Sequence, residues 1–401
     1  MRLPVRRIEM ETLVRAGREM ELIGVDPAGI RIMAPKQLHY NFKIEGLAPA
    51  QANVIKQEIL SIGGEAAIAR GAASCSIEKS GAVVSGTLKQ LNILIEKLKM
   101  QSFGLVEVAH SLNAALVNME RKEFHIRGRA KSWTAGPRTL IAGILNVTPD
   151  SFSDGALFLD KDRAVEHALR MTGDGADWID VGGESSRPGA KPVSADEELR
   201  RVLPVIEALT VKGIAVSVDT TKAAVAREAL KAGAEMINDI SALGADPEMA
   251  DVCAEYQCPV VLMHMRGTPA TMQDDVKYDD ITGEVFDYLS ERLDFAASRG
   301  VDPEKTIIDP GIGFGKSVEG NIALIRDLKG LKTLGRPILI GASRKSFISA
   351  IQGISGADGE SARLAGSVAV AVAAIRSGAE IVRVHDVKET REAALLADAL
   401  K

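Results

Sequence analysis

The sequence predicts an α/β protein in which a (β/α)8 barrel follows a smaller α+β domain. Eight short apolar runs, each followed by a helical pattern, occupy residues 139–401, and such a barrel typically needs about 250 residues. The runs are continuously apolar, as in strands that are buried on both faces. Polar residues follow all eight runs, which favours a barrel with one ring-shaped site over an open sheet with a single switch point.

The composition sets limits on the class of protein. The 401 residues are 46% hydrophobic, 26% charged and 4% aromatic, with a net charge of −5, which excludes disordered, collagen-like and disulfide-built chains. The length favours one large domain and a smaller one, and the mild acidic balance argues against a general nucleic-acid binder.

The expected location is the cytoplasm. Cys75, Cys253 and Cys258 lack a metal-like spacing, and their odd number does not suggest a secreted scaffold. The first residues lack the apolar core of a signal peptide. The longest run of small apolar residues, 366–375, is too short to span a bilayer. We therefore expect a soluble protein without a membrane partner.

Residues 1–132 are expected to form the smaller domain. The pattern predicts a strand, a helix, a hairpin of two strands and a second helix, at residues 38–44, 49–61, 72–77, 81–86 and 88–100. Short strands around helices suggest a small α+β sandwich, for which a ferredoxin-like arrangement is one candidate. Residues 133–138 read as a linker. This part of the chain has no catalytic constellation, and its role is not predicted.

The barrel strands follow in order. They are expected at residues 139–145, 176–181, 213–218, 234–239, 259–264, 305–309, 336–341 and 379–384. Helical patterns between them include residues 162–173, 195–209, 222–232 and 288–299. The pairs Gly175-Ala176, Gly233-Ala234 and Gly378-Ala379 are typical of turns that lead from a helix into a strand.

Two loops after the first strands combine turn formers with polar groups. The first, from Asn146 to Gly155, contains Phe152 and Asp154; it is either a simple turn or a lid over an anionic ligand. The second carries Arg187, whose guanidinium suits a phosphate or carboxylate. The alternative is a solvated arginine on an exposed loop.

Asp219, Asn238 and Asp309 each end an apolar run. One such residue is most often a helix N-cap, but three on one rim could bind the edge of a flat, amino-bearing heterocycle such as a pterin or a purine. A divalent metal site is the alternative, since Asp and Asn also bind hard cations. The heterocycle is the preferred interpretation.

The last three runs supply a glycine-rich loop and positive charge. Residues 309–317 fail the phosphate-loop pattern because Pro310 stands where a glycine is required, so the loop is interpreted as a ligand-facing segment with Phe314 as a stacking face. The basic residues Arg344, Lys345, Arg383 and His385 would concentrate an anion on one rim. Ion pairs with Glu380 or Asp386 are the alternative. His264 is equally compatible with a structural and a functional role.

Eight motifs in residues 139–401 together resemble the dihydropteroate synthase family. They are NVTPDSFSDG, GGESSRPGA, VDTTK, INDIS, MHMRGTPATMQ, DPGIGFGK, SRKSF and RVHDVKET, in this order. Residues 1–130 resemble the extra domain that precedes the synthase in some bacterial members. The resemblance implies a pterin-binding TIM barrel and a transferase that is a sulfonamide target. Its reaction joins 6-hydroxymethyl-7,8-dihydropterin diphosphate to 4-aminobenzoate with Mg²⁺, forming 7,8-dihydropteroate and diphosphate for folate biosynthesis.

The resemblance also implies roles for individual residues. The pterin would be held by Asp219, Asn238, Asp309 and Lys345. The diphosphate would be held by Asn146, Arg383 and His385, with Asn146 also binding the metal. The aminobenzoate would be framed by Phe152, Ser186, Arg187, Pro188, Phe314 and Ser343. The residues expected to take part in catalysis are Asp154, Asp309, Lys345 and Arg383.

Two positions depart from the family pattern. Ser186 stands where the family commonly has threonine, which keeps the hydroxyl but removes a methyl group, and Ala156 replaces a usual glycine. Small changes in the affinity for aminobenzoate or sulfonamides could follow from the first, and a more restricted loop from the second.

The expected mechanism is SN1-like, because diphosphate is a good leaving group when cations neutralise it. A corrinoid methyltransferase that uses methyltetrahydrofolate would share the pterin barrel but would bind no diphosphate, so SRKS and RVHD favour the synthase. A catalytically inactive barrel that serves as a binding subunit is the second alternative. Members of the family are usually homodimers.

Overall fold

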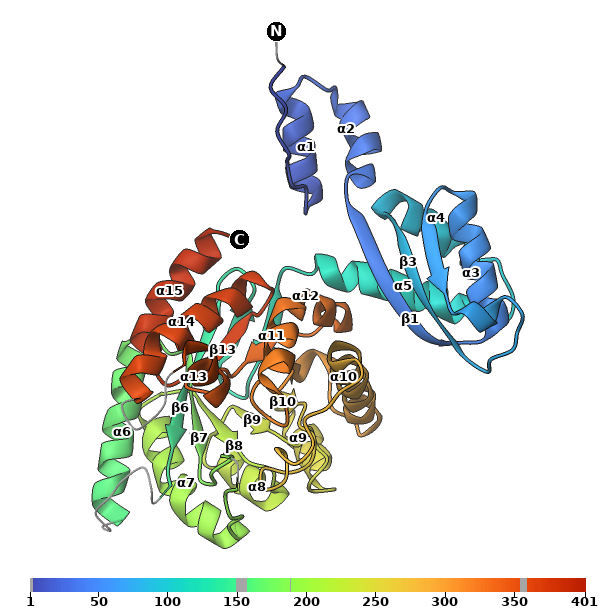
Figure 1. Ribbon diagram of the computed structural model, residues 1–401. Coiled ribbons are helices and arrows are strands. Elements are labelled where there is room, and N and C mark those ends of the chain that lie inside the picture. Colours follow the sequence, from blue (N-terminus) through green and yellow to red (C-terminus); the bar gives the residue numbers. More distant parts are fainter. Residues whose placement is uncertain (1–2, 149–156, 188, 354–358) are drawn as a thin grey trace. The chain divides into compact units, whose positions relative to one another are not determined.

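The computed structural model describes residues 3–148, 157–187, 189–353 and 359–401. The chain divides into two compact units, residues 1–117 and residues 118–401. The division falls inside helix α5 (Leu105–Glu120). Figure 1 shows the elements of both units, and each is described by itself below.

The larger unit is a parallel eight-stranded barrel surrounded by helices (Figure 1). The strand order is β11-β10-β9-β8-β7-β6-β13-β12. An isolated parallel bridge between Ile308 and Ile338 joins the two ends of this sheet and closes it. The strands are β6 (Leu140–Asn146), β7 (Trp178–Gly182), β8 (Val216–Asp219), β9 (Met236–Asp239), β10 (Val260–Met263), β11 (Thr306–Asp309), β12 (Leu339–Ile340) and β13 (Ile381–Val384). The predicted (β/α)8 barrel is confirmed.

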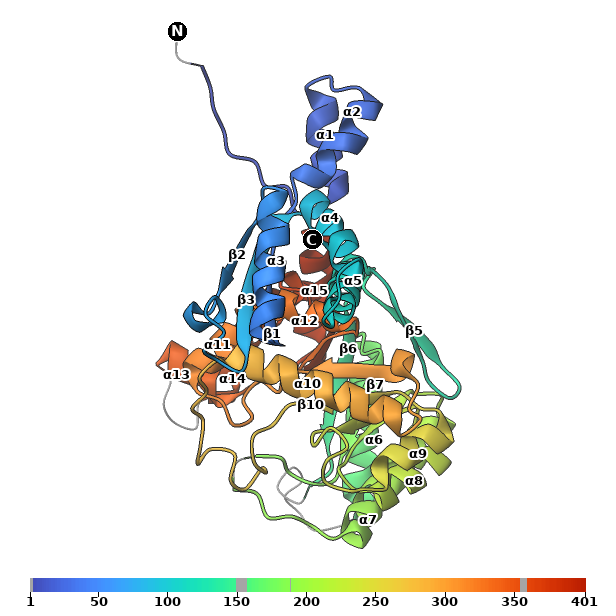
Figure 2. The same cartoon turned by 90° about the vertical axis from the view of Figure 1, so that its right-hand side faces the viewer.

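Helices follow the strands and cover the outside of the barrel (Figure 2). They are α6 (Leu157–Gly173), α7 (Ala195–Val211), α8 (Ala223–Lys231), α9 (Met249–Tyr256), α10 (Ile281–Ser298), α11 (Val318–Arg326), α12 (Leu328–Leu331), α13 (Ser346–Gln352), α14 (Gly359–Arg376) and α15 (Val387–Ala399). Apolar faces of these helices and strands form the buried core between the two layers, because strands covered on both sides bury side chains on both faces.

Three helix-to-strand turns need glycine. Gly175, Gly233 and Gly378 have φ values of 104°, 104° and 115°, a region that residues with a Cβ rarely adopt. Each stands directly before the alanine that leads into a barrel strand. The turns predicted from the three glycine-alanine pairs are therefore confirmed.

A hairpin of β4 (Phe124–Arg127) and β5 (Ser132–Ala135) closes the amino-terminal end of the barrel (Figure 2). Phe124 and Ile126 join a cluster with residues from the starts of the barrel strands, among them Trp178. The turn of the hairpin is held by Glu235, whose carboxylate accepts hydrogen bonds from the backbone N–H groups of Ala130 and Lys131 at 2.8 and 3.3 Å. The hairpin is thus part of the barrel unit.

This hairpin lies where the sequence suggested the end of the small domain and a linker. The division between the units comes earlier than residue 132, at residue 117, and Ser132–Ala135 is a strand rather than part of a linker. The physical reason is that Trp133 packs on the ring of Trp178, with centroids 5.5 Å apart. Apolar burial therefore assigns these residues to the barrel.

The smaller unit contains a three-stranded antiparallel sheet of order β1-β3-β2. Its strands are β1 (His39–Leu47), β2 (Glu65–Ile68) and β3 (Ser80–Thr87), and its helices are α1 (Leu13–Leu22), α2 (Pro27–Met33), α3 (Pro49–Ser61), α4 (Leu88–Lys99) and most of α5. With α3 linking β1 to β2, this is the split βαβ arrangement of a ferredoxin-like fold. Where that fold has a fourth strand, this chain continues into α5.

Four of the five elements predicted for this unit are confirmed, and one is wrong. The strand at 38–44, the helices at 49–61 and 88–100 and the strand at 81–86 correspond to β1, α3, α4 and β3. The strand predicted at 72–77 is wrong: residues 70–72 form a short 3-10 helix and turns follow it. The partner of β3 is β2, which lies before that segment.

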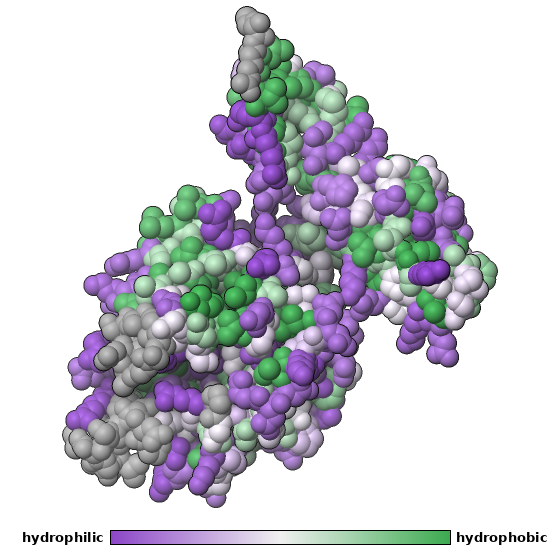
Figure 3. Space-filling model, in the orientation of Figure 1, coloured by the Kyte–Doolittle hydropathy of each residue, from purple (hydrophilic) through white to green (hydrophobic). Residues whose placement is uncertain are grey.

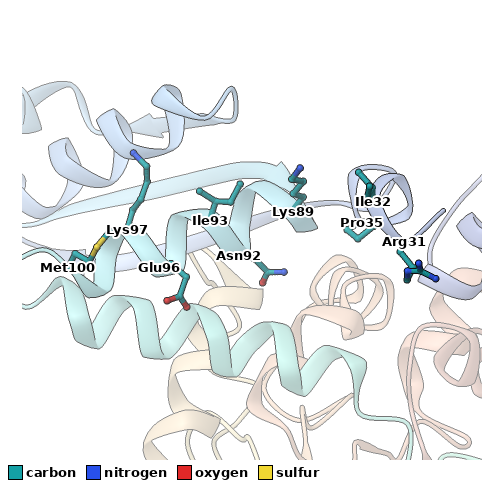
Figure 4. Close-up of a pocket in the computed structure, with 9 residues that line it drawn as sticks. All are labelled: Arg31, Ile32, Pro35, Lys89, Asn92, Ile93, Glu96, Lys97 and Met100. Atoms are coloured by element: carbon teal, nitrogen blue, oxygen red, sulfur yellow. The ribbon is translucent and has the colours of Figure 1, made fainter. Parts of the chain in front are cut away.

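The unit also has an open groove of about 660 Å³ between α4 and the segment from Arg31 to Pro35 (Figure 4). Its lining mixes basic side chains, such as Lys89, with apolar ones, such as Ile93 and Met100. Further apolar side chains are exposed on α1 and α2 (Figure 3), including Val14 and Ile32. None of the motifs that point to chemistry lies in this unit.

Among the described residues, no helix combines the length and the apolar character needed to cross a membrane.

Candidate active site

The polar residues that end the strands meet at one end of the barrel. Asn146 of β6 lies level with Gly182 of β7, Gly182 with Asp219 of β8, and Asp219 with Asn238 of β9 in the strand register. Because carboxyl ends of parallel strands share one edge, these groups form a continuous row. Gly182 has no side chain, and a Cβ at this position would lie 3.4 Å from Cβ of Asp219. The space between the side chains of Asn146 and Asp219 is therefore not filled by a side chain from β7 at this level.

Arg383 of β13 forms the centre of a buried charge network. Its Nε donates to Asp180 of β7, and its Nη2 donates to Oδ2 of Asp219 at 2.7 Å. Asp180 is 1% exposed. Burial raises the pKa of Asp219 to about 7, and the guanidinium opposes this shift. Arg383 thus offsets two carboxylates on neighbouring strands, which differs from the ion pairs with Glu380 or Asp386 considered from the sequence.

Asp309 stands at the end of β11, two strands from Arg383 in the closed barrel. It is buried, and its Oδ1 accepts from the backbone N–H of Gly311 at 2.7 Å. Burial raises the pKa of this carboxyl to about 6. A Cβ at Gly341 would lie 3.9 Å from Cβ of Arg383 and 4.0 Å from Oδ2 of Asp309. Glycine at this position leaves the space between the two side chains unfilled.

Lys345 lies over the ring of Phe314, with Nζ 3.7 Å from the ring centroid. Burial lowers the pKa of this amine to about 8, and nearby Arg383 acts in the same direction. Gly313, with φ at 81°, lies beneath the Lys345 stem. The glycine-rich loop therefore places the ring of Phe314 against the amine of Lys345.

A second buried lysine, Lys316, holds that loop in place. Its Nζ lies 2.9 Å from Nδ1 of His264 and donates to the carbonyl oxygen of Phe314 at 2.9 Å. Burial lowers its pKa to about 7. The ring of His264 packs edge-on against Tyr288, with centroids 4.8 Å apart, and burial lowers the pKa of His264 to about 3. Both contacts favour the structural reading of His264.

Ser343 and His385 are also brought together. The Ser343 hydroxyl lies 3.1 Å from Nδ1 of His385 and accepts from its backbone N–H at 3.2 Å. Burial lowers the pKa of His385 to about 3, with Arg344 and Arg383 adding to the shift. At pH 7 this imidazole is neutral. Arg344 donates to Asp386 through Nη2 at 2.6 Å, so the positive charge on the inner rim comes mainly from Arg383 and Lys345.

A cavity of about 410 Å³ opens between the loops after β7, β8, β9 and β10. Ser186 and Asp219 both line it. Arg187 follows Ser186 on the same loop and is exposed, and its backbone N–H lies 3.4 Å from the Ser185 hydroxyl. Three expected site residues, Phe152, Asp154 and Pro188, lie outside the described residues.

The sequence reasoning missed two residues of this site. Asp180 was hidden inside an apolar strand run, although an acid within such a run is itself a signal of buried pairing. Lys316 was read only as part of a failed phosphate-loop pattern. Asp239, which follows Asn238, has a different role: it accepts from Ser241 and Leu243 and holds the loop after β9.

No cluster of three His, Cys, Asp or Glu side chains suited to a metal ion exists in the described parts of the chain. Asp219 is engaged by Arg383, and Asn238 donates to Asp180 at 2.9 Å. The arrangement thus favours the heterocycle over a metal held by the Asp-Asn-Asp rim. A buried row of acceptors beside a guanidinium and an amine can bind a donor-rich ring that carries an anionic group.

Comparison with known proteins defines the class as the pterin-binding enzymes. The profile described as "Pterin binding enzyme" matches residues 142–385. A dihydropteroate synthase from Synechocystis is 49% identical over 266 residues, which cover 66% of this chain and 91% of that protein. The dihydropteroate synthase of Escherichia coli is 48% identical over 260 residues, or 65% of this chain and 90% of the relative. The chain belongs to the dihydropteroate synthase family of pterin-binding enzymes.

Two further matches add detail. A structure of Xanthomonas albilineans dihydropteroate synthase with 4-aminobenzoic acid is 44% identical, with a TM-score of 0.65, and the match covers 69% of this chain and 98% of that one. A probable bifunctional folylpolyglutamate synthase/dihydropteroate synthase from Halobacterium salinarum is 41% identical over 393 residues. That alignment covers 98% of this chain, including its smaller unit, and 47% of the relative.

Proposed function

We propose that the barrel joins 6-hydroxymethyl-7,8-dihydropterin diphosphate to 4-aminobenzoate, releasing diphosphate and forming 7,8-dihydropteroate for folate biosynthesis. The observation that carries the proposal is the juxtaposition of Asp219, Asn238 and Asp309 with Arg383 and Lys345 at the carboxyl end of the barrel. Xanthomonas albilineans relatives bound to 4-aminobenzoic acid and to 7,8-dihydropteroate support the same ligands here.

The pterin is assigned to the acceptor row. Asp219, Asn238 and Asp309 would accept hydrogen bonds from the ring N–H groups and the exocyclic amine, and Lys345 would donate to an oxygen or nitrogen of the ring. A carboxylate that accepts two parallel bonds discriminates strongly against a ring without those donors. The burial of Asp309 and Asn238 supports this role, since buried donors on the ligand need partners.

The diphosphate is assigned to Asn146, Arg383 and His385. Arg383 would exchange part of its bonding with Asp180 and Asp219 for the anion, and the neutral ring of His385 would donate one hydrogen bond. Asn146 lies at the end of β6 beside Gly182 and offers a single carboxamide oxygen. That donor suits Mg²⁺, which usually takes one or two protein oxygens, substrate phosphates and water. When bound, Mg²⁺ would neutralise charge on the leaving diphosphate.

The proposed chemistry is an SN1-like substitution. The C–O bond to the diphosphate breaks with its electron pair on the leaving oxygen, and the electron-rich dihydropterin stabilises the resulting methylene cation. The neutral aromatic amine then attacks this carbon and loses a proton. Asp309 would offset positive charge on the ring, and Asp154 is proposed for the same role from the first loop. Loops that exclude water protect the cation. No covalent enzyme intermediate is required.

The aminobenzoate is assigned to the outer part of the site. Phe314 would provide an aromatic face and Ser343 a hydroxyl, while Ser186 and Arg187 would frame the carboxylate together with Phe152 and Pro188. Ser186 lines the 410 Å³ cavity, and Arg187, the next residue along the chain, is exposed. An exposed guanidinium suits a ligand carboxylate that arrives from solvent.

The two alternatives make different demands on the site. A corrinoid methyltransferase that uses methyltetrahydrofolate would need no diphosphate group, yet Arg383 and Lys345 both face the acceptor row. A catalytically inactive binding subunit would not need to keep buried charges, which cost free energy. The synthase reaction is favoured on both counts. A homodimer and a cytoplasmic location complete the proposal.

The test incubates the purified full chain with pterin diphosphate, Mg²⁺ and 4-aminobenzoate and measures both dihydropteroate and diphosphate. Both products are expected in equal amounts. Pterin binding without either product would favour the binding subunit. Methyl transfer from methyltetrahydrofolate to a corrinoid, without diphosphate release, would favour the methyltransferase.

A further inference from the structure

Asp180 occupies an unusual position for a carboxylate. It lies within β7, is 1% exposed, and faces the centre of the site. Its Oδ1 accepts from the Ser217 hydroxyl, and its Oδ2 accepts from both Asn238 and Arg383. These three donors occupy three of the roughly four acceptor sites of a carboxylate, and the guanidinium offsets its charge, so Asp180 is bound mainly by groups of the protein itself.

The contact between Asp180 and Asn238 fixes the orientation of the side-chain amide of Asn238. An ionised carboxylate only accepts hydrogen bonds, so the Nδ2 group of Asn238 must face Asp180, at 2.9 Å from Oδ2. The amide is planar, and its Oδ1 therefore lies on the other side of Cγ. Without this constraint the two orientations of an amide have similar shapes and can exchange. The carboxylate thus decides which atom of Asn238 a ligand meets.

We propose that Asp180 is a positioning residue that sets the donor-acceptor pattern of the pterin site, an inference that rests on the proposed function. It presents the carbonyl oxygen of Asn238 to the ligand, so that Asp219, Asn238 and Asp309 form three acceptors for a donor-rich ring edge. The same Oδ2 anchors Arg383 between β7 and β8. One carboxylate outside the ligand's reach therefore couples the pterin and diphosphate halves of the site.

The test uses three variants and measures the Kd of 6-hydroxymethylpterin as well as kcat and KM for the diphosphate substrate. Asp180→Ala removes the acceptor, and we expect pterin binding to weaken ~10- to 100-fold, as for the loss of a buried hydrogen-bond partner in a site built for polar recognition. Asp180→Asn keeps a carbonyl oxygen that can face Asn238 and Arg383 while its amide faces Ser217. We expect its Kd to stay within ~5-fold of the parent value.

The third variant separates orientation from packing. In Asp180→Ala/Asn238→Asp, both terminal atoms at position 238 are acceptors, so orientation no longer matters, and a carboxylate remains beside Arg383. We expect this double variant to bind pterin at least ~5-fold more tightly than Asp180→Ala. A purely structural role would give no such rescue, because the cavity at position 180 is the same in both.

Ser217→Ala serves as the control, since it removes a bond to Asp180 without touching Asn238 or Arg383, and thermal unfolding monitors the fold of each variant. The inference is overturned if Asp180→Ala binds pterin like the parent, or if the double variant binds no better than Asp180→Ala. It is also overturned if Asp180→Asn binds pterin as weakly as Asn238→Ala does. If Asp180→Ala does not fold, this comparison of Asp180→Asn with Asn238→Ala is the test of the inference. Absence of turnover in the parent protein would count against the proposed function alone, because pterin binding is measured separately.

Discussion

The two units of this chain bury very different side chains. In the smaller unit, the buried positions of the sheet hold residues such as Phe42, Ala82 and Val84, and Ser80 is the one polar residue classed as buried there among the described residues. In the barrel, buried polar and charged residues are numerous and include Asp180, Asp309 and Lys316. Both units combine helices with a sheet, yet the buried charged residues among those described lie in the barrel.

This difference in buried charge indicates which unit carries the active site. A buried charge costs several kcal/mol unless partners satisfy it, and an ordinary fold has little reason to retain several of them. One group of these buried charges, Asp180, Asp219 and Arg383, is joined by hydrogen bonds inside the barrel, whereas Glu235 is buried at the amino-terminal end and holds the β4–β5 hairpin. The smaller unit keeps its ion pairs on the surface, as for Lys43 and Glu45, whose side chains are 49% and 50% exposed. Substitutions that remove charge should therefore have unequal effects in the two units.

The largest effect is expected from Arg383→Ala. This change removes the proposed diphosphate donor and leaves Asp180 and Asp219 buried without their guanidinium, so kcat/KM should fall by roughly 100- to 1000-fold and stability by about 3–5 kcal/mol. Steady-state kinetics and urea unfolding provide the measurements. Lys43→Ala in the smaller unit is the control and should cost no more than about 0.5 kcal/mol. Unchanged turnover in Arg383→Ala would disprove the diphosphate assignment.

A truncation tests whether the β4–β5 hairpin is an integral part of the barrel unit. A fragment of residues 136–401 lacks Phe124 and Ile126, each of which contributes about 1.5–3 kcal/mol of apolar burial, and it exposes the amino-terminal end of the barrel. We expect it to be less stable than a fragment of residues 118–401 by roughly 3–6 kcal/mol in chemical unfolding. Equal stability of the two fragments would show that the hairpin is not an integral part of the barrel.

Asn238→Ala should weaken pterin binding by about 1–3 kcal/mol, since it removes one buried set of hydrogen bonds, and Asp219→Ala should act similarly. Calorimetric titration with 6-hydroxymethylpterin gives the affinity. Asn41→Ala makes the matched change in the smaller unit, where Asn41 accepts from Ser85 on the open face of the sheet. Its pterin affinity should equal that of the parent, and a loss there would break the contrast between the units.

The smallest effect is expected for the change in stability per pH unit that Lys316 contributes. Burial lowers its pKa to about 7, whereas the unfolded chain binds this proton up to about pH 10.4. Between these values the unfolded state holds more protons than the folded state, so stability rises with pH by roughly 1 kcal/mol per pH unit. Unfolding measured at pH 7, 8 and 9 should show this rise in the parent relative to Lys316→Met. Parallel curves would contradict it.

Much of the barrel was predictable because its strands are buried on both faces. Continuous apolar runs that end in a polar residue gave all eight strands, and the glycine-alanine pairs marked three of the turns. The helix α5 and the β4–β5 hairpin were missed, because what fixes the hairpin is packing of Phe124 and Trp133 on strands far along the chain. The failed strand at 72–77 has a similar cause, since the partner of β3 is decided by tertiary pairing and not by local pattern.

The site was predictable in its residue types but not in its pairings. Asp219, Asn238, Asp309 and Arg383 could be found because each is a polar residue at or near the end of an apolar run. Their partners could not, because Arg383 and Asp180 are separated by 203 positions in the sequence and no local pattern links them. The neutral state of the His385 imidazole also could not be predicted from the sequence, because it follows from burial beside two arginines rather than from the residue type.

The closure of the barrel has a consequence for motion. Neighbouring strands elsewhere share ladders of paired residues, but β11 and the short strand β12 meet through the single bridge between Ile308 and Ile338. Local opening costs least where the fewest backbone hydrogen bonds break, so we expect this seam to open more readily than the rest of the barrel. Asp309 lies on one side of it and Ser343 and Lys345 follow on the other. Hydrogen exchange at the seam would thus report on the walls of the ligand site itself.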